Sequence, residues 1–226
     1  MADDTAKARW TAVDDYVDEL LVGQDAALRE ALGASTAAGL PSINVTPAHG
    51  KMLHLLARAV GARMVLEIGT LGGYSTIWLA RALAPGGRLV TIEADAKHAA
   101  IAGANIARAD VADRVDLRIG RALDVLPGLA GEGAGPFDMI FIDADKPSTP
   151  DYFSWALRLS RPGTMILIDN VVRDGAVADA DSRDPSVVAM RRVLQMVASE
   201  PRVSATVVQT VGGKGYDGLA IVLVTR

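Results

Sequence analysis

Apolar residues follow two patterns along this chain, and the two patterns alternate. Short continuous apolar runs, bounded by glycine, proline or charged residues, predict strands that are buried on both faces of a parallel sheet. Five strands are predicted in this way or by their place in the alternation, at residues 64–68, 89–93, 115–119, 138–142 and 164–168. Predicted helices lie between them, at residues 74–83, 95–109, 121–129 and 152–159. The alternation predicts an α/β fold with a mainly parallel sheet, helices on both of its faces, and ligands at the carboxyl ends of the strands.

The chain ahead of the first strand is predicted to be largely helical. Apolar residues at three- and four-residue steps give one helix an apolar face, made of Trp10, Val13, Val17, Leu20 and Leu21. That face must pack against the rest of the domain or against a second copy of the chain. Residues 33–41, rich in Gly, Ala and Ser, predict a loop. Thr46 and Pro47 then predict the N-cap and the first position of a second helix, which ends at Gly61.

The end of the chain departs from the strand and helix alternation. Residues 203–207 alternate between apolar and polar positions, a glycine-rich turn follows, and residues 219–224 form another apolar run. This pattern predicts a terminal hairpin. The hairpin adds two strands, one of them antiparallel, so the predicted sheet is mainly parallel and has seven strands.

Composition narrows the class of protein. With 226 residues and no break in composition, the chain is predicted to form one domain over residues 1–226, in which residues 1–42 are an N-terminal helical extension. The formal net charge is −4 and the basic residues are scattered, which argues against a nucleic-acid or membrane partner. The absence of cysteine excludes disulfides and cysteine chemistry. Because no segment resembles a signal peptide or a membrane span, a cytoplasmic location is expected.

The first predicted strand runs into a glycine-rich turn, Gly69-Thr70-Leu71-Gly72-Gly73. Glycines at such a turn allow backbone conformations and a close ligand approach that a Cβ atom would prevent. One interpretation is a tight turn that binds nothing, and a second is a nicotinamide-binding loop. The second requires the spacing G-x-G-x-x-G, which this turn does not have.

Two glutamates flank this turn in the predicted fold. Glu93 ends the second strand, 24 residues after Gly69, where an acid in a nucleotide-binding fold typically accepts hydrogen bonds from the hydroxyls of a ribose. The alternative for Glu93 is a solvated carboxylate at a strand end, and the glycine turn favours the ribose role. Glu67 lies inside the first strand, where a buried carboxylate is costly unless it is paired or hydrogen-bonded.

Oxygen-bearing side chains also end the fourth and fifth predicted strands. Asp143 closes the fourth strand, and Asp169 with Asn170 closes the fifth. If those strands are neighbours, the three side chains converge at one edge of the sheet. Two carboxylates and an amide oxygen suit Mg²⁺, or a similar divalent ion such as Mn²⁺ or Ca²⁺, whereas Zn²⁺ usually recruits His or Cys. For each residue alone, the alternative is a helix cap or an Asx turn.

Lys146, three residues after Asp143, is a candidate general base. The ordinary alternative is a solvated surface lysine. Beside a divalent cation, nearby positive charge and partial burial would both favour the neutral amine, which can accept a proton from a substrate hydroxyl. The histidines lie on or beside predicted helices without the spacing of a metal site, so they are interpreted as structural or exposed; they are His49, His54 and His98.

These motifs together resemble one protein family. Residues 65–75 contain E-x-G-x-x-x-G-Y-S, residues 141–146 spell F-I-D-A-D-K, and Asp169 is followed by Asn170. From Asn44 to the C-terminus, the chain is similar to the cation-dependent class I S-adenosylmethionine O-methyltransferases, the group that contains catechol O-methyltransferase and caffeoyl-coenzyme A O-methyltransferase. The resemblance implies a Rossmann-like class I methyltransferase fold. It also implies methyl transfer to a hydroxyl of a catechol-like small molecule, a vicinal dihydroxy aromatic.

The resemblance further implies roles for individual residues. The implied catalytic residues are Lys146, as general base, and Asp143. The implied cofactor contacts are Val45, Gly69 and Ser75 at the methionine portion, Ala122 near the adenine, and also Glu67, Thr70, Gly73, Glu93 and Asp143. The implied metal ligands are Asp143, Asp169 and Asn170. Bacterial and plant relatives form homodimers, so we expect a homodimer that acts on a phenolic small molecule.

Two positions depart from the family pattern and bear on the substrate. The plant enzymes that act on coenzyme A thioesters carry an aromatic residue where this chain has Thr149, and usually Trp where it has Arg173. Aromatic stacking on a phenylpropanoid is therefore not expected. Arg173 could meet an anionic group on the acceptor, or it could be an ordinary exposed arginine in a loop. Two further classes stay open: a protein of this fold without catalysis, against which the intact site residues argue, and a nicotinamide-dependent oxidoreductase, against which the missing fingerprint argues.

Overall fold

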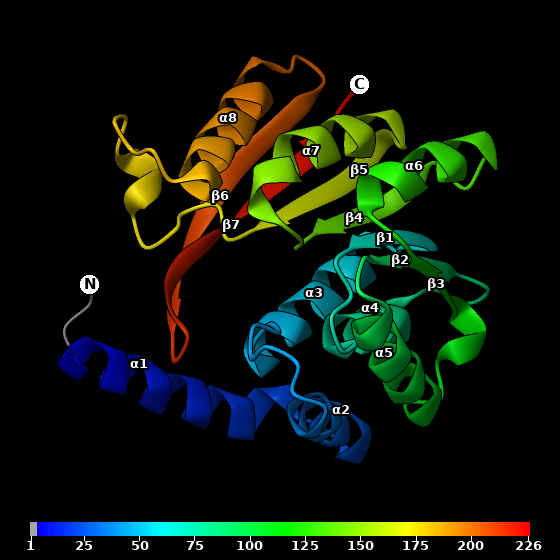
Figure 1. Ribbon diagram of the computed structural model, residues 1–226, viewed down its shortest axis with the longest axis vertical. Helices are drawn as coiled ribbons and strands as arrows, with labels where there is room; N and C mark the ends of the chain where they lie inside the picture. Colours follow the sequence, from blue (N-terminus) through cyan, green and yellow to red (C-terminus); the bar gives the residue numbers. More distant parts are fainter. Residues whose placement is uncertain (1–3) are drawn as a thin grey trace.

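The computed structural model describes residues 4–226, which are organised around a sheet of seven strands in the order β3-β2-β1-β4-β5-β7-β6 (Figure 1). The strands are β1 (Met64–Ile68), β2 (Arg88–Glu93), β3 (Val115–Ile119), β4 (Phe137–Ile142), β5 (Ser160–Asp169), β6 (Val203–Gly212) and β7 (Gly215–Val224). Strands β1 to β5 pair in parallel, and β7 is antiparallel to both β5 and β6. The predicted fold, including the single antiparallel strand in a C-terminal hairpin, is confirmed.

Helices cover both faces of the sheet (Figure 1). They are α1 (Asp4–Val17), α2 (Ala26–Ala37), α3 (Pro47–Ala59), α4 (Tyr74–Ala82), α5 (Ala96–Arg108), α6 (Ala122–Gly131), α7 (Thr149–Arg158) and α8 (Pro185–Ser199). Successive strand residues point to opposite faces, so Val65 packs with α3, α4 and α5, whereas Leu66 packs with α6, α7 and α8. The continuous apolar runs of the sequence follow from this burial on both faces.

The chain reverses its direction across the sheet between β1 and β4. It passes from β1 outwards to β2 and β3, and then returns to the other side of β1 as β4. The carboxyl ends of β1 and β4 are in close contact, since Asp143 N–H donates to the carbonyl of Ile68 at 2.9 Å. Gly69 has φ 99°, and a Cβ atom there would lie 2.0 Å from the carbonyl oxygen of Asp143. Only glycine fits this position, which is where open α/β sheets bind their ligands.

The prediction of a loop over residues 33–41 is wrong in part, because helix α2 continues to Ala37. Asp25 caps this helix by accepting a hydrogen bond from the amide of Leu28. The hydroxyls of Ser35 and Thr36 donate to backbone carbonyls four residues earlier, so these small polar residues stay within the helix. Tertiary burial of one side of α2 outweighs its weak local preference for helix.

Two other features were missed or misplaced. Helix α8 was not predicted, although Asp184 caps its first turn and Pro185 occupies its first position. Strand β5 begins at Ser160 rather than at Thr164, because its pairing with β4 starts there and resumes after an irregularity. Residues 161–163, ahead of the predicted start of this strand, therefore lie within it.

The N-terminal helix α1 extends away from the sheet and meets the turn of the β6–β7 hairpin (Figure 1). Asp14 accepts a hydrogen bond from the amide of Gly213 at 2.7 Å. The predicted apolar face is largely uncovered in one chain, since Val13 and Leu20 are each 60% exposed and Leu21 is 71% exposed. None of the helices in the described range has the length and apolar character needed to cross a membrane.

Candidate active site

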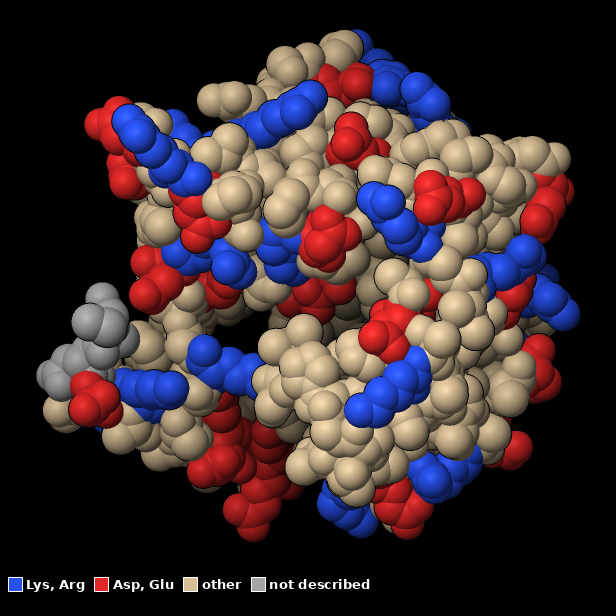
Figure 2. All heavy atoms as spheres, in the orientation of Figure 1, with Lys and Arg blue, Asp and Glu red and all other residues tan. Residues whose placement is uncertain are grey.

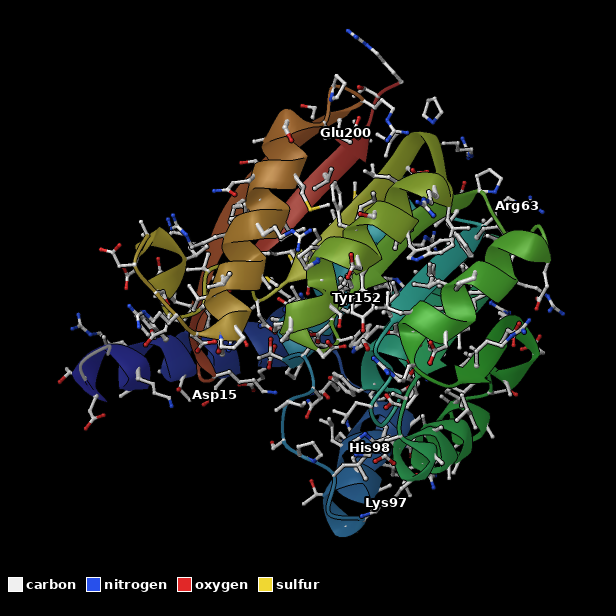
Figure 3. The ribbon with its side chains drawn as sticks, turned by 45° about the horizontal axis from the view of Figure 1, so that its top comes forward. Asp15, Arg63, Lys97, His98, Tyr152 and Glu200 are labelled. Atoms are coloured by element: carbon white, nitrogen blue, oxygen red, sulfur yellow. The ribbon has the colours of Figure 1, made fainter. Side chains whose placement is uncertain are left out.

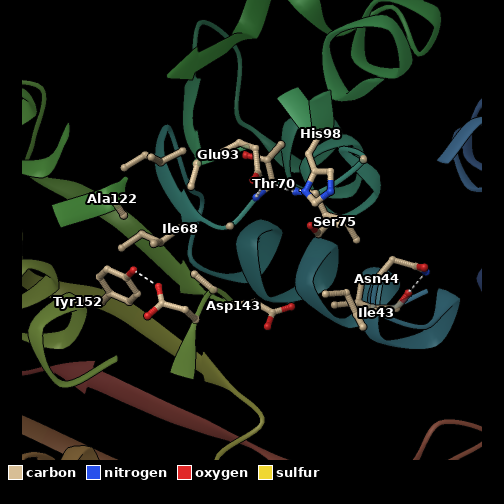
Figure 4. A pocket seen from close by; sticks show the side chains of 18 of the residues that line it. Ile43, Asn44, Ile68, Thr70, Ser75, Glu93, His98, Ala122, Asp143 and Tyr152 are labelled. Atoms are coloured by element: carbon tan, nitrogen blue, oxygen red, sulfur yellow. Dashed lines mark hydrogen bonds and ion pairs between the residues drawn. The ribbon is translucent and has the colours of Figure 1, made fainter. Parts of the chain in front are cut away.

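A cavity of about 600 Å³ lies at the carboxyl ends of β1, β2 and β4 (Figure 4). Its size is typical of sites for small molecules and cofactors. Residues of the predicted site that line it are Val45, Gly69, Thr70, Ser75, Glu93, Ala122, Asp143, Lys146 and Asn170. Three more predicted residues do not line it: Glu67, Gly73 and Asp169. The fold therefore brings most of the predicted residues together around one cavity.

Glu93 fixes the shape of the glycine turn. Its Oε2 accepts hydrogen bonds from the amides of Thr70 and Leu71, at 3.2 and 2.7 Å, and its Oε1 accepts one from Asp95 at 3.0 Å. A carboxylate has about four acceptor positions, so one position, on Oε1, remains for a ligand hydroxyl at the cavity surface. Gly73 has φ 81° and directly precedes α4, so it shapes the turn although it does not line the cavity.

Glu67 is fully buried beneath the turn. Its Oε2 accepts hydrogen bonds from the hydroxyls of Thr76 and Thr91, at 2.5 and 2.7 Å, while its Oε1 has no hydrogen-bond partner among the described residues. Burial raises the pKa of Glu67 to about 7, although hydroxyl hydrogen bonds act in the opposite direction. Thr91 also shares a hydrogen bond with Thr70, which links Glu67 to the turn.

Replacing Glu67 with glutamine should flatten the pH dependence of stability. Because the folded-state pKa lies above the unfolded value of 4.5, the folded protein binds this proton more tightly, and the free energy of unfolding falls as pH rises from about 4.5 to 7. Urea unfolding near pH 5 and pH 8 would measure the loss, which should be smaller in Glu67→Gln than in the wild type. The exposed Glu19→Gln is the matched control. An equal loss in Glu67→Gln and wild type would contradict this account.

The predicted carboxylate pair lies at the edge of two neighbouring strands. Ile142 of β4 pairs with Ile168 of β5, so Asp143 and Asp169 follow at adjacent positions. The two strands are thus neighbours, which the convergence of these side chains requires. Asp169 is buried, and its Oδ1 accepts a hydrogen bond from the amide of Asn170 at 2.8 Å. Burial raises the pKa of Asp169, the charge of Asp143 raises it further, and Lys146 opposes both effects.

These oxygen donors fit a hard divalent cation. Two close carboxylates repel each other, and a cation between them would relieve both the repulsion and the cost of burying Asp169. Asn170 contributes an amide from the cavity wall, and its backbone has the uncommon φ of 59°. Within residues 4–226 there is no group of three or more His, Cys, Asp or Glu side chains placed to hold a metal, so a third protein ligand beside the two carboxylates would have to be of another type, such as the amide of Asn170.

Lys146 is held beside Asp143 by an ion pair, with Nζ 2.7 Å from Oδ1. Its side chain is 14% exposed. It lies in the short 3₁₀ turn Lys146–Ser148, which Asp145 caps by accepting a hydrogen bond from the amide of Ser148. Asp145 also accepts a hydrogen bond from the hydroxyl of Tyr152, drawn as a dashed line in Figure 4. Lys146 is therefore anchored at the cavity surface by its own turn and by Asp143.

Several residues of this region were not predicted from the sequence. His98 lines the cavity, and its Nδ1 is 3.6 Å from Glu93 Oε1. His49 lies behind the carboxylates, with Nδ1 4.0 Å from Asp169 Oδ2, and its Nε2 is buried without a partner in the described chain. The interpretation of these two histidines as structural or exposed stays a prediction, although both border the site. Figure 3 shows His98 far from Arg63, which precedes β1, and Tyr152 near the centre of the molecule.

Comparison with known proteins agrees with this geometry. The family model for O-methyltransferases matches residues 19–223. Two curated relatives, both named catechol O-methyltransferase, are similar over most of the chain. The protein from Niastella koreensis is 54% identical over 94% of this chain and 96% of its own, and the protein from Mycobacterium tuberculosis is 56% identical over 94% of each chain.

A solved structure is similar over its whole length. The O-methyltransferase from Bacillus cereus in complex with SAH has a TM-score of 0.96 and 57% sequence identity, and the match covers 97% of this chain and 100% of that chain. The family model spans most of the sequence, and these relatives are more than half identical to it. The chain therefore belongs to the O-methyltransferase family.

Proposed function

We propose that this O-methyltransferase transfers a methyl group from S-adenosylmethionine to one hydroxyl of a catechol-like acceptor, with the help of a divalent cation. The observation that supports this proposal most is that a single cavity is lined both by the glycine turn with Glu93 and by Asp143, Lys146 and Asn170. The relatives named catechol O-methyltransferase and the SAH complex of the Bacillus cereus protein support this proposal.

In this proposal, the glycine turn side of the cavity binds the cofactor. The remaining acceptor position of the Glu93 carboxylate, on Oε1, receives a ribose hydroxyl. Val45 and Ser75, which line the same cavity, contact the methionine portion, and Ala122 contacts the adenine. Glu67 supports the turn from below through the threonine hydroxyls that join it to Thr70.

The acceptor end of the site would carry out the transfer. Asp143, Asp169 and Asn170 would hold the cation, and when bound it would supply positive charge that acidifies an acceptor hydroxyl and favours the neutral amine of Lys146. Lys146 takes the hydroxyl proton. The acceptor oxygen then forms a bond to the methyl carbon as the carbon–sulfur bond breaks, which converts the sulfonium into a thioether. Positioning of the two reactants supplies much of the rate.

A panel of catechols and monophenols tests the proposal directly. With S-adenosylmethionine and Mg²⁺, the purified enzyme should methylate catechols but not the matching monophenols, because only a vicinal diol offers two oxygens to one cation. EDTA should abolish the activity, and Mg²⁺ should restore it. Mass spectrometry of the products is the measurement. Methylation of monophenols at the same rate, or full activity in EDTA, would contradict the proposed mechanism.

We also propose that the exposed apolar face of α1 and the following π-helical turn, Asp18–Val22, packs against a second copy in a two-fold homodimer. Light scattering at micromolar concentration should give twice the mass of one chain. Replacing Leu20 and Leu21 with lysine should shift the mass towards that of the monomer. A monomeric mass for the wild type would contradict the dimer. The single domain over residues 1–226 and the cytoplasmic location stay predictions.

A further inference from the structure

Arg173 lies at the acceptor end of the cavity, three residues after Asn170. Its backbone φ is 56°, in the left-handed region that non-glycine residues seldom adopt. Asp217 holds this conformation, because its Oδ1 accepts hydrogen bonds from the amides of Val172, Arg173 and Gly218 at 2.9 to 3.0 Å. Unusual backbone conformations that surrounding contacts enforce cluster at ligand sites.

The guanidinium of Arg173 is poorly satisfied within the described chain. Its Nε is buried and has no hydrogen-bond partner. Its NH1 is 3.9 Å from Asp217 Oδ2, which is longer than a hydrogen bond. Since the other oxygen of Asp217 is occupied by three backbone amides, this carboxylate anchors the loop rather than pairing closely with the arginine. Arg173 therefore presents unused donors at the cavity wall.

A second cation approaches the same end from the opposite side. Lys214 lies in the turn of the β6–β7 hairpin and donates a hydrogen bond to the carbonyl of Asn44, which also lines the cavity. In residues 4–226, no carboxylate lies within 4.0 Å of its ammonium. Burial lowers the pKa of Lys214, and the charges of Asp143 and Asp169 oppose that shift.

The hairpin turn that carries Lys214 is held on two sides. Asp14 of α1 accepts a hydrogen bond from Gly213, and the amide of Asp174 donates to the carbonyl of Tyr216 at 3.2 Å. The loop of Arg173 and the hairpin of Lys214 are thus attached to each other. Figure 2 shows basic side chains on both sides of the hollow between this hairpin and α3. These hydrogen bonds hold the two segments that carry Arg173 and Lys214 in position without a ligand.

We infer that Arg173, assisted by Lys214, selects acceptors that carry a carboxylate, so that the preferred substrate is a catechol with an acidic side group. This inference rests on the proposed function. The planar guanidinium offers parallel N–H donors that match the two oxygens of a carboxylate, which an ammonium alone does not. Asp217, the carboxylate nearest to the guanidinium, holds three backbone amides through its Oδ1, so the positive charge of Arg173 is available to the ligand.

The test compares acids with their methyl esters, which have the same diol but no negative charge. For the pairs 3,4-dihydroxybenzoate and its methyl ester, and caffeate and its methyl ester, the wild type should have a kcat/KM about 10-fold higher for the acid, as expected for one charge-assisted contact. Arg173→Met should remove most of this acid-to-ester ratio. Arg173→Lys should keep part of this ratio, because the positive charge remains although the paired N–H donors of the guanidinium are lost.

Two further variants make the test specific. Lys214→Met should lower the ratio to a smaller extent than Arg173→Met, and it leaves the strained loop untouched. Arg183→Met removes one positive charge from an exposed position in the segment before α8, so the ratio should equal that of the wild type. The dissociation constant of S-adenosylhomocysteine should change little in Arg173→Met, since the arginine is assigned to the acceptor.

The outcomes separate this inference from the proposed function. Equal kcat/KM values for acids and esters in the wild type, with good turnover of both, would overturn the selection of carboxylates and leave the catechol proposal intact. A loss of S-adenosylhomocysteine binding in Arg173→Met, with an unchanged ratio, would overturn it by assigning the arginine to the cofactor. Failure of the wild type to methylate any of the four diols would overturn both proposals.

Discussion

Replacing Lys146 with alanine should lower kcat by about 10²- to 10⁴-fold, the usual cost of losing one positioned general base. The amine is the basic group closest to Asp143, at 2.7 Å, and it lines the cavity at the acceptor end. Binding of S-adenosylhomocysteine, measured by calorimetry, should be retained because Glu93 and the glycine turn are unchanged. Steady-state rates with a catechol and saturating Mg²⁺ are the measurement.

The pH profile of the same variant distinguishes a base from a structural role. As the acceptor ionises at higher pH, it no longer needs a base, so Lys146→Ala should recover part of its rate above about pH 9. The exposed Lys97→Ala, on α5, is the matched control and should behave as the wild type (Figure 3). Normal turnover of Lys146→Ala near pH 7 would rule out the lysine as the base.

Replacing Asp169 with alanine should nearly abolish cation binding and activity together. Loss of an outer-shell partner of a metal costs about 10- to 100-fold in affinity, so loss of a direct charged ligand should cost more. The cation alone provides the readout: Mg²⁺ or Mn²⁺ should raise the melting temperature of the wild type and leave that of Asp169→Ala unchanged. Asp113→Ala, whose side chain is 77% exposed in the native protein, is the control.

The cation-free protein gives an independent check on the same residue. Burial and the charge of Asp143 raise the pKa of Asp169 above its unfolded value. The free energy of unfolding therefore falls as pH rises from the unfolded pKa to the folded pKa, because the buried carboxyl must ionise. Without cations, Asp169→Asn should therefore melt above the wild type near pH 8, although it binds no Mg²⁺. A lower melting temperature there, combined with normal Mg²⁺ binding, would show that Asp169 is a structural residue.

Local patterns in the sequence predicted the strands well, and the reason is burial. Strands β1, β2, β4 and β5 are covered on both faces over most of their length, so their residues are mostly apolar and stand out from the amphipathic helices, whereas β3 is a half-buried edge strand. Asp143 and Asp169 were recognisable because they interrupt such runs at their carboxyl ends. Helix α2 was not predicted as a separate helix, because Gly33, Ser35 and Thr36 in its last part have weak helix preferences, and packing against the domain decided its length.

The sequence by itself determined the family, the succession of the strands with the helices between β1 and β5, and most residues that line the candidate site, because these depend on short motifs and on the periodicity of burial. Only the tertiary structure decided which distant segments meet. The contacts of Asp14 with Gly213 and of Asn44 with Lys214 join residues 199 and 170 positions apart. Likewise, the raised pKa of Glu67 and the unsatisfied Nε of Arg173 arise from burial by several elements at once, and no local pattern encodes the exclusion of water.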